Sequence, residues 1–265
     1  MKEKNNQVVN LLWTGGWDST FRLMQLLLLH KKIVQPYYLI DPDRSSTAVE
    51  IRTMRNIKKY LFSKYPKAIE LLLPTIFKEI SDIQLNKNLS DSFEKSLKDK
   101  YIGSQYEFIA RFCDEIGINN MELSVEIGGN SEKFLKPYLT QSGTEKDIVY
   151  VIDSKYAGSD IHALFKYFKL PIFYLSKTDM EKIAINENFA DILDLTWFCH
   201  NPTANFKPCG VCTPCVDAMK RGMIRRMPIS SQIRYYFRIR SRLRSLSWKY
   251  PKFYNFLQKW KKQIF

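Results

Sequence analysis

Short apolar runs alternate with amphipathic helical patterns along the first part of this 265-residue chain. Residues 8–13, 33–40 and 69–76 are rich in large apolar and β-branched side chains, as buried parallel strands are. Residues 19–31 and 47–64 lie between these runs and show the apolar spacing of helices. The order β-α-β-α-β predicts an α/β fold, a doubly wound parallel sheet covered by helices on both faces.

The same alternation continues beyond residue 100. Further helices are predicted over residues 105–116, 160–168 and 178–186, and further strands over 121–127 and 171–175. The polar residues 78–100 are predicted to form a surface excursion, and residues 128–147 a loop. With 45% hydrophobic residues the chain can bury a full-sized core, which excludes an intrinsically disordered protein.

The net charge of +14 is concentrated near the C-terminus. Residues 225–265 contain twelve Lys and Arg and no acidic residue, which leaves +2 for residues 1–224. We therefore interpret residues 1–224 as the body of the protein and residues 225–265 as a basic amphipathic helical tail. An apolar stripe at helical spacing begins at Tyr235 and continues through Ile239, Leu243, Leu246 and Tyr250.

Three binding partners are compatible with such a tail. It can dock on its own domain or on a partner protein, lie on an anionic membrane surface, or hold a nucleic-acid backbone. Docking is favoured, because aromatic stripes at helical spacing are more often packed than exposed.

Targeting signals are not expected in this chain. Residues 1–6 are polar, and no apolar run approaches the roughly 18 residues of a membrane-spanning helix. Five Cys without an export signal indicate a reducing compartment. A cytoplasmic protein is the expectation.

A glycine turn joins the first predicted strand to the first predicted helix; it consists of Thr14, Gly15, Gly16, Trp17, Asp18, Ser19 and Thr20. Two glycines permit a tight turn with exposed backbone N–H groups, and the following helix N-terminus adds partial positive charge. Thr14, Ser19 and Thr20 offer hydroxyl donors to a phosphate, and Asp18 could hold Mg²⁺ or cap the helix. The alternative is a capped strand–helix turn that binds no ligand.

Four cysteines follow the spacing C-x9-C-x2-C-x2-C within residues 196–222; they are Cys199, Cys209, Cys212 and Cys215. Four thiolates can saturate a tetrahedral Zn²⁺, so the spacing favours a structural zinc site that clamps this loop to the following helix. An iron–sulfur cluster and unliganded thiols are the alternatives. Cys113 lies in a predicted helix and is expected to be a buried side chain.

The glycine turn resembles the S-G-G-x-D-S signature of PP-loop ATP pyrophosphatases, with Thr14 in the first Ser position. Together with T-W-x-C…P-C-G-x-C-x-x-C near residue 200, it is similar to the 7-cyano-7-deazaguanine (preQ0) synthases of queuosine biosynthesis. Two further segments match: residues 127–132 resemble I-G-x-N-[AS]-E, and residues 175–177 resemble L-x-K. The resemblance covers residues 8–222 and implies a PP-loop fold of the HUP type, which is Rossmann-like.

The segments that correspond to the substrate-binding side of this family depart from its sequence pattern. The P-G-R-N element appears as residues 102–105 without its Arg, and Lys133 replaces the Asp that follows N-[AS]-E. The Y-P-D-C-R element is missing, and residues 41–44 only loosely match D-Y-G-Q-R. The reaction type therefore carries over better than the acceptor.

The resemblance implies an ATP-dependent carbon–nitrogen ligase. In this family ATP adenylates the carboxylate of 7-carboxy-7-deazaguanine with release of pyrophosphate, and ammonia attacks the acyl-adenylate. A second adenylation, on the amide oxygen, allows dehydration to the nitrile. ATP, Mg²⁺ and Zn²⁺ are the implied cofactors, and the acceptor here is expected to be this or another carboxylate, small or carried by a macromolecule. A homo-oligomer is expected.

The resemblance also assigns roles to residues. The glycine turn from Thr14 to Thr20, Trp17 included, binds the nucleotide, and Asp18 coordinates the Mg²⁺ ion. Asp18, Ser19 and Lys177 are the catalytic candidates, with Lys177 supplying positive charge to a phosphate. Asn130 and Glu132 are candidates for touching the acceptor, although a capped strand end explains them equally well.

Two other functions remain open from the sequence. One is tRNA modification by a related PP-loop enzyme, for instance thiolation; it requires binding to RNA, for which the tail is suited. The other is a non-catalytic nucleotide-binding scaffold.

Overall fold

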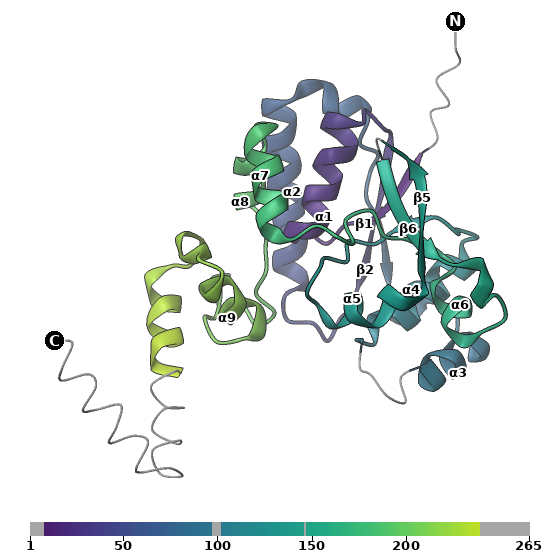
Figure 1. Cartoon of the computed structure of the whole chain (residues 1–265). Coiled ribbons are helices and arrows are strands. Elements are labelled where there is room, and N and C mark those ends of the chain that lie inside the picture. Colours follow the sequence, from purple (N-terminus) through teal and green to yellow (C-terminus); the bar gives the residue numbers. More distant parts are fainter. Residues whose placement is uncertain (1–7, 97–101, 146, 239–265) are drawn as a thin grey trace, which may run out of the picture. The chain divides into compact units, whose positions relative to one another are not determined.

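A computed structural model describes residues 8–96, 102–145 and 147–238 (Figure 1). The chain forms two compact units, Met1–Trp197 and Phe198–Phe265. The predicted tail of residues 225–265 stays a prediction, because residues 239–265 lie outside the described part of the chain. The helices within the described ranges are all too short or too polar to cross a membrane.

The first unit is built on a five-stranded parallel sheet. Its strand order is β3 (Ile76–Glu79), β2 (Val34–Ile40), β1 (Val9–Leu12), β4 (Met121–Glu122) and β7 (Phe168–Lys169). The central β1 strand is apolar and continues into Trp13, which has no exposed surface. The parallel order confirms the predicted α/β sheet.

Two groups of helices cover the opposite faces of this sheet (Figure 1). One group comprises α1 (Trp17–Met24), α2 (Thr47–Lys64), α7 (Lys177–Asn186) and α8 (Ala190–Asp194). The other comprises α3 (Lys87–Ser96), α4 (Gln105–Glu115) and α6 (Asp160–Phe165). Each group has its own aromatic core: Phe21 packs on Phe189 at 5.9 Å between ring centroids, and Tyr106 packs on Phe165 at 5.1 Å. The sheet is therefore doubly wound, as predicted.

The prediction of a loop over residues 128–147 is wrong. This segment contains α5 (Asn130–Leu135) and β5 (Leu139–Thr144), which pairs antiparallel with β6 (Asp147–Ile152). β5 is polar and largely exposed, so it lacks the apolar alternation that marks a half-buried strand. Its partner β6 supplies the buried side chains of the hairpin, Val149 and Ile152.

Two predicted strands are also misplaced. Residues 171–175 are not a strand; the edge strand β7 precedes them. The third strand is Ile76–Glu79 rather than residues 69–76, because a 3-10 turn over Pro66–Glu70 occupies the start of that apolar run. Periodicity cannot tell such apolar turns from strands when the run is this short.

The second unit holds the four cysteines and α9 (Thr213–Lys220), followed by a 3-10 turn over Met223–Arg226. Residues 229–238 are helical, so the predicted tail begins as a helix. The predicted stripe beyond Tyr235 lies outside the described residues.

Candidate nucleotide site and metal centre

The glycine turn follows β1 directly and has a backbone shape that requires glycine. Gly15 has φ of +69°, and a Cβ there would lie 3.0 Å from Met54 Cγ and 3.3 Å from the Glu50 carbonyl oxygen. The Trp197 N–H donates to the Gly15 carbonyl at 2.9 Å and holds the turn from the far side. The turn thus brings the chain close to α2 while it leads into the N-terminus of α1.

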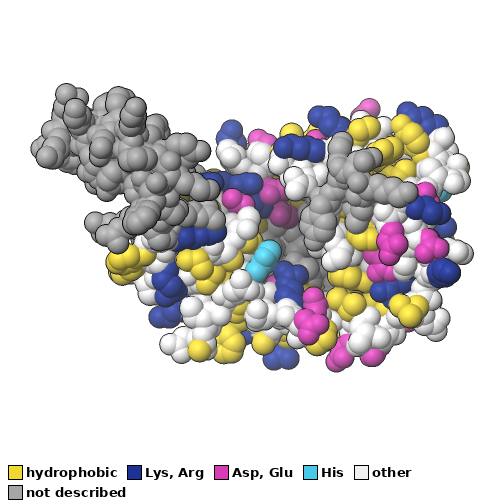
Figure 2. Space-filling model, turned by 90° about the horizontal axis from the view of Figure 1, so that it is seen from below, with side chains coloured by type: hydrophobic (Ala, Val, Ile, Leu, Met, Phe, Trp, Pro, Cys, Tyr) yellow, Lys and Arg dark blue, Asp and Glu magenta, His cyan; other side chains and the backbone are white. Residues whose placement is uncertain are grey.

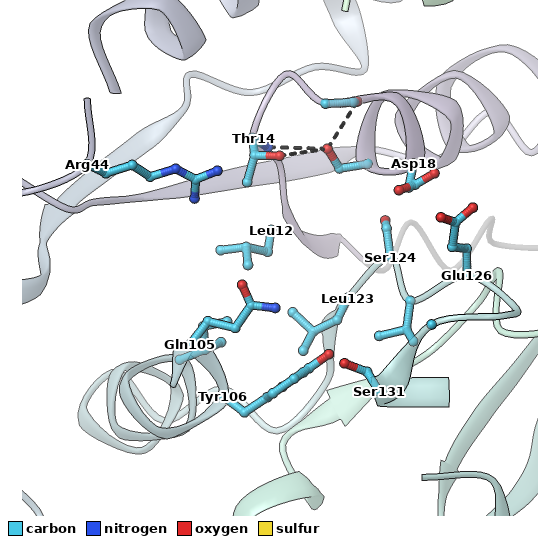
Figure 3. A pocket seen from close by; sticks show the side chains of 15 residues that line it. Leu12, Thr14, Asp18, Arg44, Gln105, Tyr106, Leu123, Ser124, Glu126 and Ser131 are labelled. Carbon is cyan, nitrogen blue, oxygen red and sulfur yellow. Dashed lines mark hydrogen bonds between the residues drawn. The ribbon is translucent and has the colours of Figure 1, made fainter. Parts of the chain in front are cut away.

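The hydroxyls of the turn divide into two groups. Ser19 Oγ accepts a hydrogen bond from Thr14 N at 3.3 Å, lies 3.3 Å from Thr14 Oγ1 and donates to the Gly16 carbonyl at 3.4 Å (Figure 3). Thr20, in contrast, is fully buried, and its Oγ1 accepts from Trp13 Nε1 at 3.0 Å. Trp17 is buried as well. Thr14 and Ser19 face the cavity described below, whereas Thr20 and Trp17 are not among its lining residues.

A charge cluster joins residues from three segments beside this turn. Lys177 Nζ lies 2.6 Å from Asp18 Oδ1 and 3.1 Å from Glu126 Oε1. Lys177 is the first residue of α7, and a capping box between Ser176 and Asp179 fixes that helix start. The structure therefore brings together Asp18 and Lys177, two of the predicted catalytic residues. Sequence reasoning missed Glu126, although a carboxylate shortly after a buried parallel strand is a usable signal.

A cavity of about 320 Å³ opens beside the turn at the carboxyl ends of β1 and β4 (Figure 3). It is lined by Leu12, Thr14, Gly16, Asp18, Ser19, Arg44, Gln105, Tyr106, Ile109, Leu123, Ser124, Val125, Glu126, Gly129 and Ser131. The strand order reverses between β1 and β4, since β2 and β3 lie on one side of β1 and β7 lies beyond β4. In open α/β sheets, ligands bind in the crevice at this switch point.

The far wall of the cavity comes from the segments in which the sequence departs from the synthase pattern. Arg44 follows β2 and is held by Glu50 at 2.9 Å and by Ser46 Oγ at 2.9 Å. Gln105 and Tyr106 come from the start of α4 (Figure 3). The Ser124 hydroxyl is buried and has no hydrogen-bond partner among the described residues, so a bound ligand could satisfy it.

Asn130 and Glu132, the predicted acceptor residues, lie next to the cavity but not in its lining. Asn130 is exposed at the start of α5. Glu132 is buried, accepts a hydrogen bond from the Gly128 N–H at 3.4 Å and lies 3.6 Å from Lys136 Nζ. These contacts fit the alternative of a capped strand end, and the acceptor role stays a prediction.

The four predicted metal ligands form one cluster in the second unit. The Sγ atoms of Cys199, Cys209, Cys212 and Cys215 all lie within 4.8 Å of one another. Backbone N–H groups point at the sulfurs: Cys209 N donates to Cys199 Sγ at 3.1 Å and Cys212 N to Cys209 Sγ at 3.2 Å. Hydrogen bonding with Cys199 and Cys215 lowers the pKa of Cys212 far below its ordinary value. Such a cluster could hold a metal.

Comparisons with known proteins find similarity among solved structures. No protein-family model matches the chain, and no curated protein matches it. Among solved structures, the chain is similar to the U34-tRNA thiolase NcsA from Methanococcus maripaludis with its [4Fe-4S] cluster, at 13% identity and a TM-score of 0.41. The similarity covers 89% of this chain and 73% of the thiolase chain.

The placement of the five cysteines predicts how many thiols react with Ellman's reagent under different conditions. We expect a chelator to expose the four clustered thiols to Ellman's reagent, whereas Cys113 should react only in guanidinium chloride. Cys113 has no exposed surface, and burial raises the pKa of its thiol to about 12. In Cys113→Ala the thiol that reacts only in guanidinium chloride should be lost, while the number of thiols that react after chelation should stay the same. Reaction of Cys113 in the folded protein would contradict its placement.

Proposed function

We propose that this chain is a PP-loop type ATP-dependent ligase that adenylates a carboxylate and couples it to ammonia or another amine. The observation that carries the proposal is the contact of Lys177 with Asp18 and Glu126 beside the glycine turn. An anion-binding turn, a cation and two carboxylates at one edge of a parallel sheet are the parts that cleavage of ATP to AMP and pyrophosphate requires.

Each group at this edge has a distinct role in the proposed reaction. N–H groups of the glycine turn, together with the Thr14 and Ser19 hydroxyls, would bind phosphate oxygens. Asp18 and Glu126 offer carboxylate oxygens, the ligands that Mg²⁺ prefers, and bound Mg²⁺ would neutralise negative charge on the leaving pyrophosphate. The Lys177 ammonium lies between the same two carboxylates. It would turn to the phosphates when the nucleotide binds.

The far wall of the cavity suits an anionic acceptor. Arg44 stands across the cavity from Asp18 (Figure 3) and can pair with a planar carboxylate. Gln105 and Tyr106 add polar groups at the start of α4. Because residues 41–44 and 102–105 depart from the synthase pattern, the acceptor is proposed to be a carboxylate that is either 7-carboxy-7-deazaguanine or a relative recognised by this different set of side chains.

The cysteine cluster fits a single zinc ion. Zn–S bonds of about 2.3 Å in a tetrahedron place the sulfurs ~3.8 Å apart. The Cys199–Cys212 and Cys209–Cys215 sulfur pairs are 3.8 and 3.9 Å apart. A [4Fe–4S] cluster binds its cysteines through four separate irons and needs a wider ring of sulfurs. We propose a closed, structural Zn²⁺ site, which would stabilise the second unit rather than take part in catalysis.

Product analysis tests the proposed function. The full-length protein is incubated with ATP, Mg²⁺, ammonia and 7-carboxy-7-deazaguanine, then with a panel of other carboxylates. AMP and pyrophosphate in equal amounts, together with an amide or nitrile identified by mass, would support the ligase. AMP formed only with tRNA and a sulfur donor would indicate thiolation instead, and nucleotide binding without turnover would indicate a scaffold.

A matched pair of variants connects this activity to the site. Asp18→Asn should abolish AMP formation, because it removes a charge from the proposed metal ligand. Asp82→Asn removes one carboxylate from an exposed 3-10 turn outside the cavity lining and should leave turnover unchanged. Equal turnover by the two variants would exclude Asp18 from the chemistry.

A further inference from the structure

The whole net charge of the protein lies in its second unit. Residues 198–265 contain fifteen Lys and Arg and one acidic residue, Asp217, whereas residues 1–197 contain 26 basic and 26 acidic residues. The second unit therefore carries +14, and the first is neutral. On the face drawn in Figure 2, the described basic and acidic side chains are interspersed. Within the second unit, residues 225–265 carry +12 and residues 198–224 carry +2.

The helix of residues 229–238 is fixed to the cysteine loop through its polar side. Ser231 has no exposed surface and donates to the Pro208 carbonyl. Arg234 donates to the Cys209 carbonyl at 2.7 Å and to the Pro208 carbonyl at 3.1 Å. The helix approaches so closely that a Cβ on Gly210 would overlap the Ser231 backbone. Arg238 donates to the Val211 carbonyl, so two arginines of this helix point at the loop.

Its other side presents apolar side chains to solvent. Ile229 is 74% exposed, Ile233 50%, Tyr236 57% and Phe237 64%. Their spacing of i, i+4, i+7 and i+8 places them on one side of a helix. We call these four residues the apolar face. Exposed single apolar residues are common, but four on one short helix mark an interaction surface.

We propose that the apolar face and the positive charge of the second unit bind this protein to an anionic lipid bilayer. The apolar side chains would enter the boundary between headgroups and acyl chains, and Lys and Arg would be attracted to anionic headgroups. Each basic residue near such a surface contributes about 1 kcal/mol, so the excess of Lys and Arg in the second unit adds an electrostatic attraction to the insertion of the apolar face.

The side chains favour a bilayer over RNA. Half of the apolar face, Ile229 and Ile233, has no ring on which a base could stack, and Arg234 of the same helix donates to loop carbonyls. Tyr236 and Phe237 offer rings that suit either partner, since aromatic side chains are also enriched at the boundary between headgroups and acyl chains. An exposed apolar surface on a unit with an excess of positive charge matches the two components of an anionic membrane, an apolar interior and a negative surface. This proposal does not depend on the proposed ligase activity.

Vesicle flotation of the metal-loaded full-length protein tests the proposal. The probes are vesicles of phosphatidylcholine alone and of equal parts phosphatidylcholine and phosphatidylglycerol. We expect binding to the anionic vesicles only, weakened by salt and reduced at least tenfold in Ile229→Ser/Ile233→Ser. The matched control is Ile69→Ser/Ile185→Ser, which removes two exposed isoleucines from the neutral unit, 55% and 61% exposed, and should bind as the unchanged protein does. Neither variant alters the charge.

Three results would overturn the proposal. One is equal flotation of the two double variants. Another is flotation abolished by tRNA, with tighter binding to tRNA than to vesicles. The third is a change from dimer to monomer in Ile229→Ser/Ile233→Ser, which would make a second copy the occupant of the apolar face. If that variant loses its metal, Tyr236→Ser/Phe237→Ser provides the same test on the other half of the face.

Discussion

Replacing Glu122 by Gln is expected to lower the free energy of unfolding of the first unit by about 3 kcal/mol. Arg22 is 2% exposed, and its Nε and Nη2 lie 2.7 and 2.9 Å from the two Glu122 carboxylate oxygens. Burial opposes this charge, yet the hydrogen bonds and charges of Glu122 and Asp147 leave the pKa of Arg22 raised. The neutral amide of the Glu122→Gln variant would leave a buried guanidinium with Asp147 as its remaining charged partner, at 2.8 Å.

Hydrogen exchange of the β1 backbone amides measures this loss, because these amides open with the unit as a whole. Lys155→Ala is the control: its ion pair with Asp153 is on the surface, where such a pair contributes roughly 0–1 kcal/mol. The double variant Arg22→Met/Glu122→Leu should be more stable than Glu122→Gln, since it removes the charge that the single substitution leaves buried. Equal loss in the single and double variants would contradict this account.

Local sequence patterns predict the parts of the fold that are themselves local. Helix α2 is predicted over Thr47–Lys64, where the structure places it, because an 18-residue amphipathic stretch shows its period over several turns. The β1 strand, the glycine turn and the first helix follow one another within a few residues, so composition and turn chemistry are sufficient to locate them, although α1 begins at Trp17 and not at the predicted residue 19. The four cysteines are close in the sequence, and their spacing predicts the cluster.

Features that depend on distant contacts are harder to predict. The β5 strand is polar and is defined by its partner β6, not by its own pattern. The buried pair of Arg22 and Glu122 joins residues 100 positions apart, and no periodicity reports such a pair. Glu126 lines the cavity because β4 ends beside β1, an adjacency that only the sheet order reveals.

The residues that line the cavity show a related limit of prediction from the sequence. Residues 41–44 and 102–105 could be identified as departures from a family pattern, but not as neighbours. The structure places Arg44 and Gln105 around one cavity with the glycine turn. Two departures that look unrelated in the sequence therefore lie around one cavity, and the identity of the acceptor is the open part of the proposed reaction.

Lys177→Ala is expected to reduce the rate of AMP formation by about 10²–10³-fold, the effect of removing one preorganised donor to a developing negative charge. Lys177 belongs to α7 but reaches Asp18 of α1 and Glu126 after β4. In the proposed reaction its ammonium would meet the charge that accumulates on the departing pyrophosphate. The fall should appear in kcat more than in KM, because the charge grows as the bond to the α-phosphate breaks.

Two further variants separate charge from geometry in this experiment. Lys177→Arg keeps the charge but changes the compact ammonium to a planar fork, so it should recover part of the lost rate. Lys182→Ala removes an exposed cation from the same helix and should turn over normally, which controls for the overall charge of α7. Normal turnover by Lys177→Ala would remove Lys177 from the mechanism. The phosphate-binding role would then rest on the glycine turn and the carboxylates alone, as in an anion site that binds nucleotide without a dedicated cation.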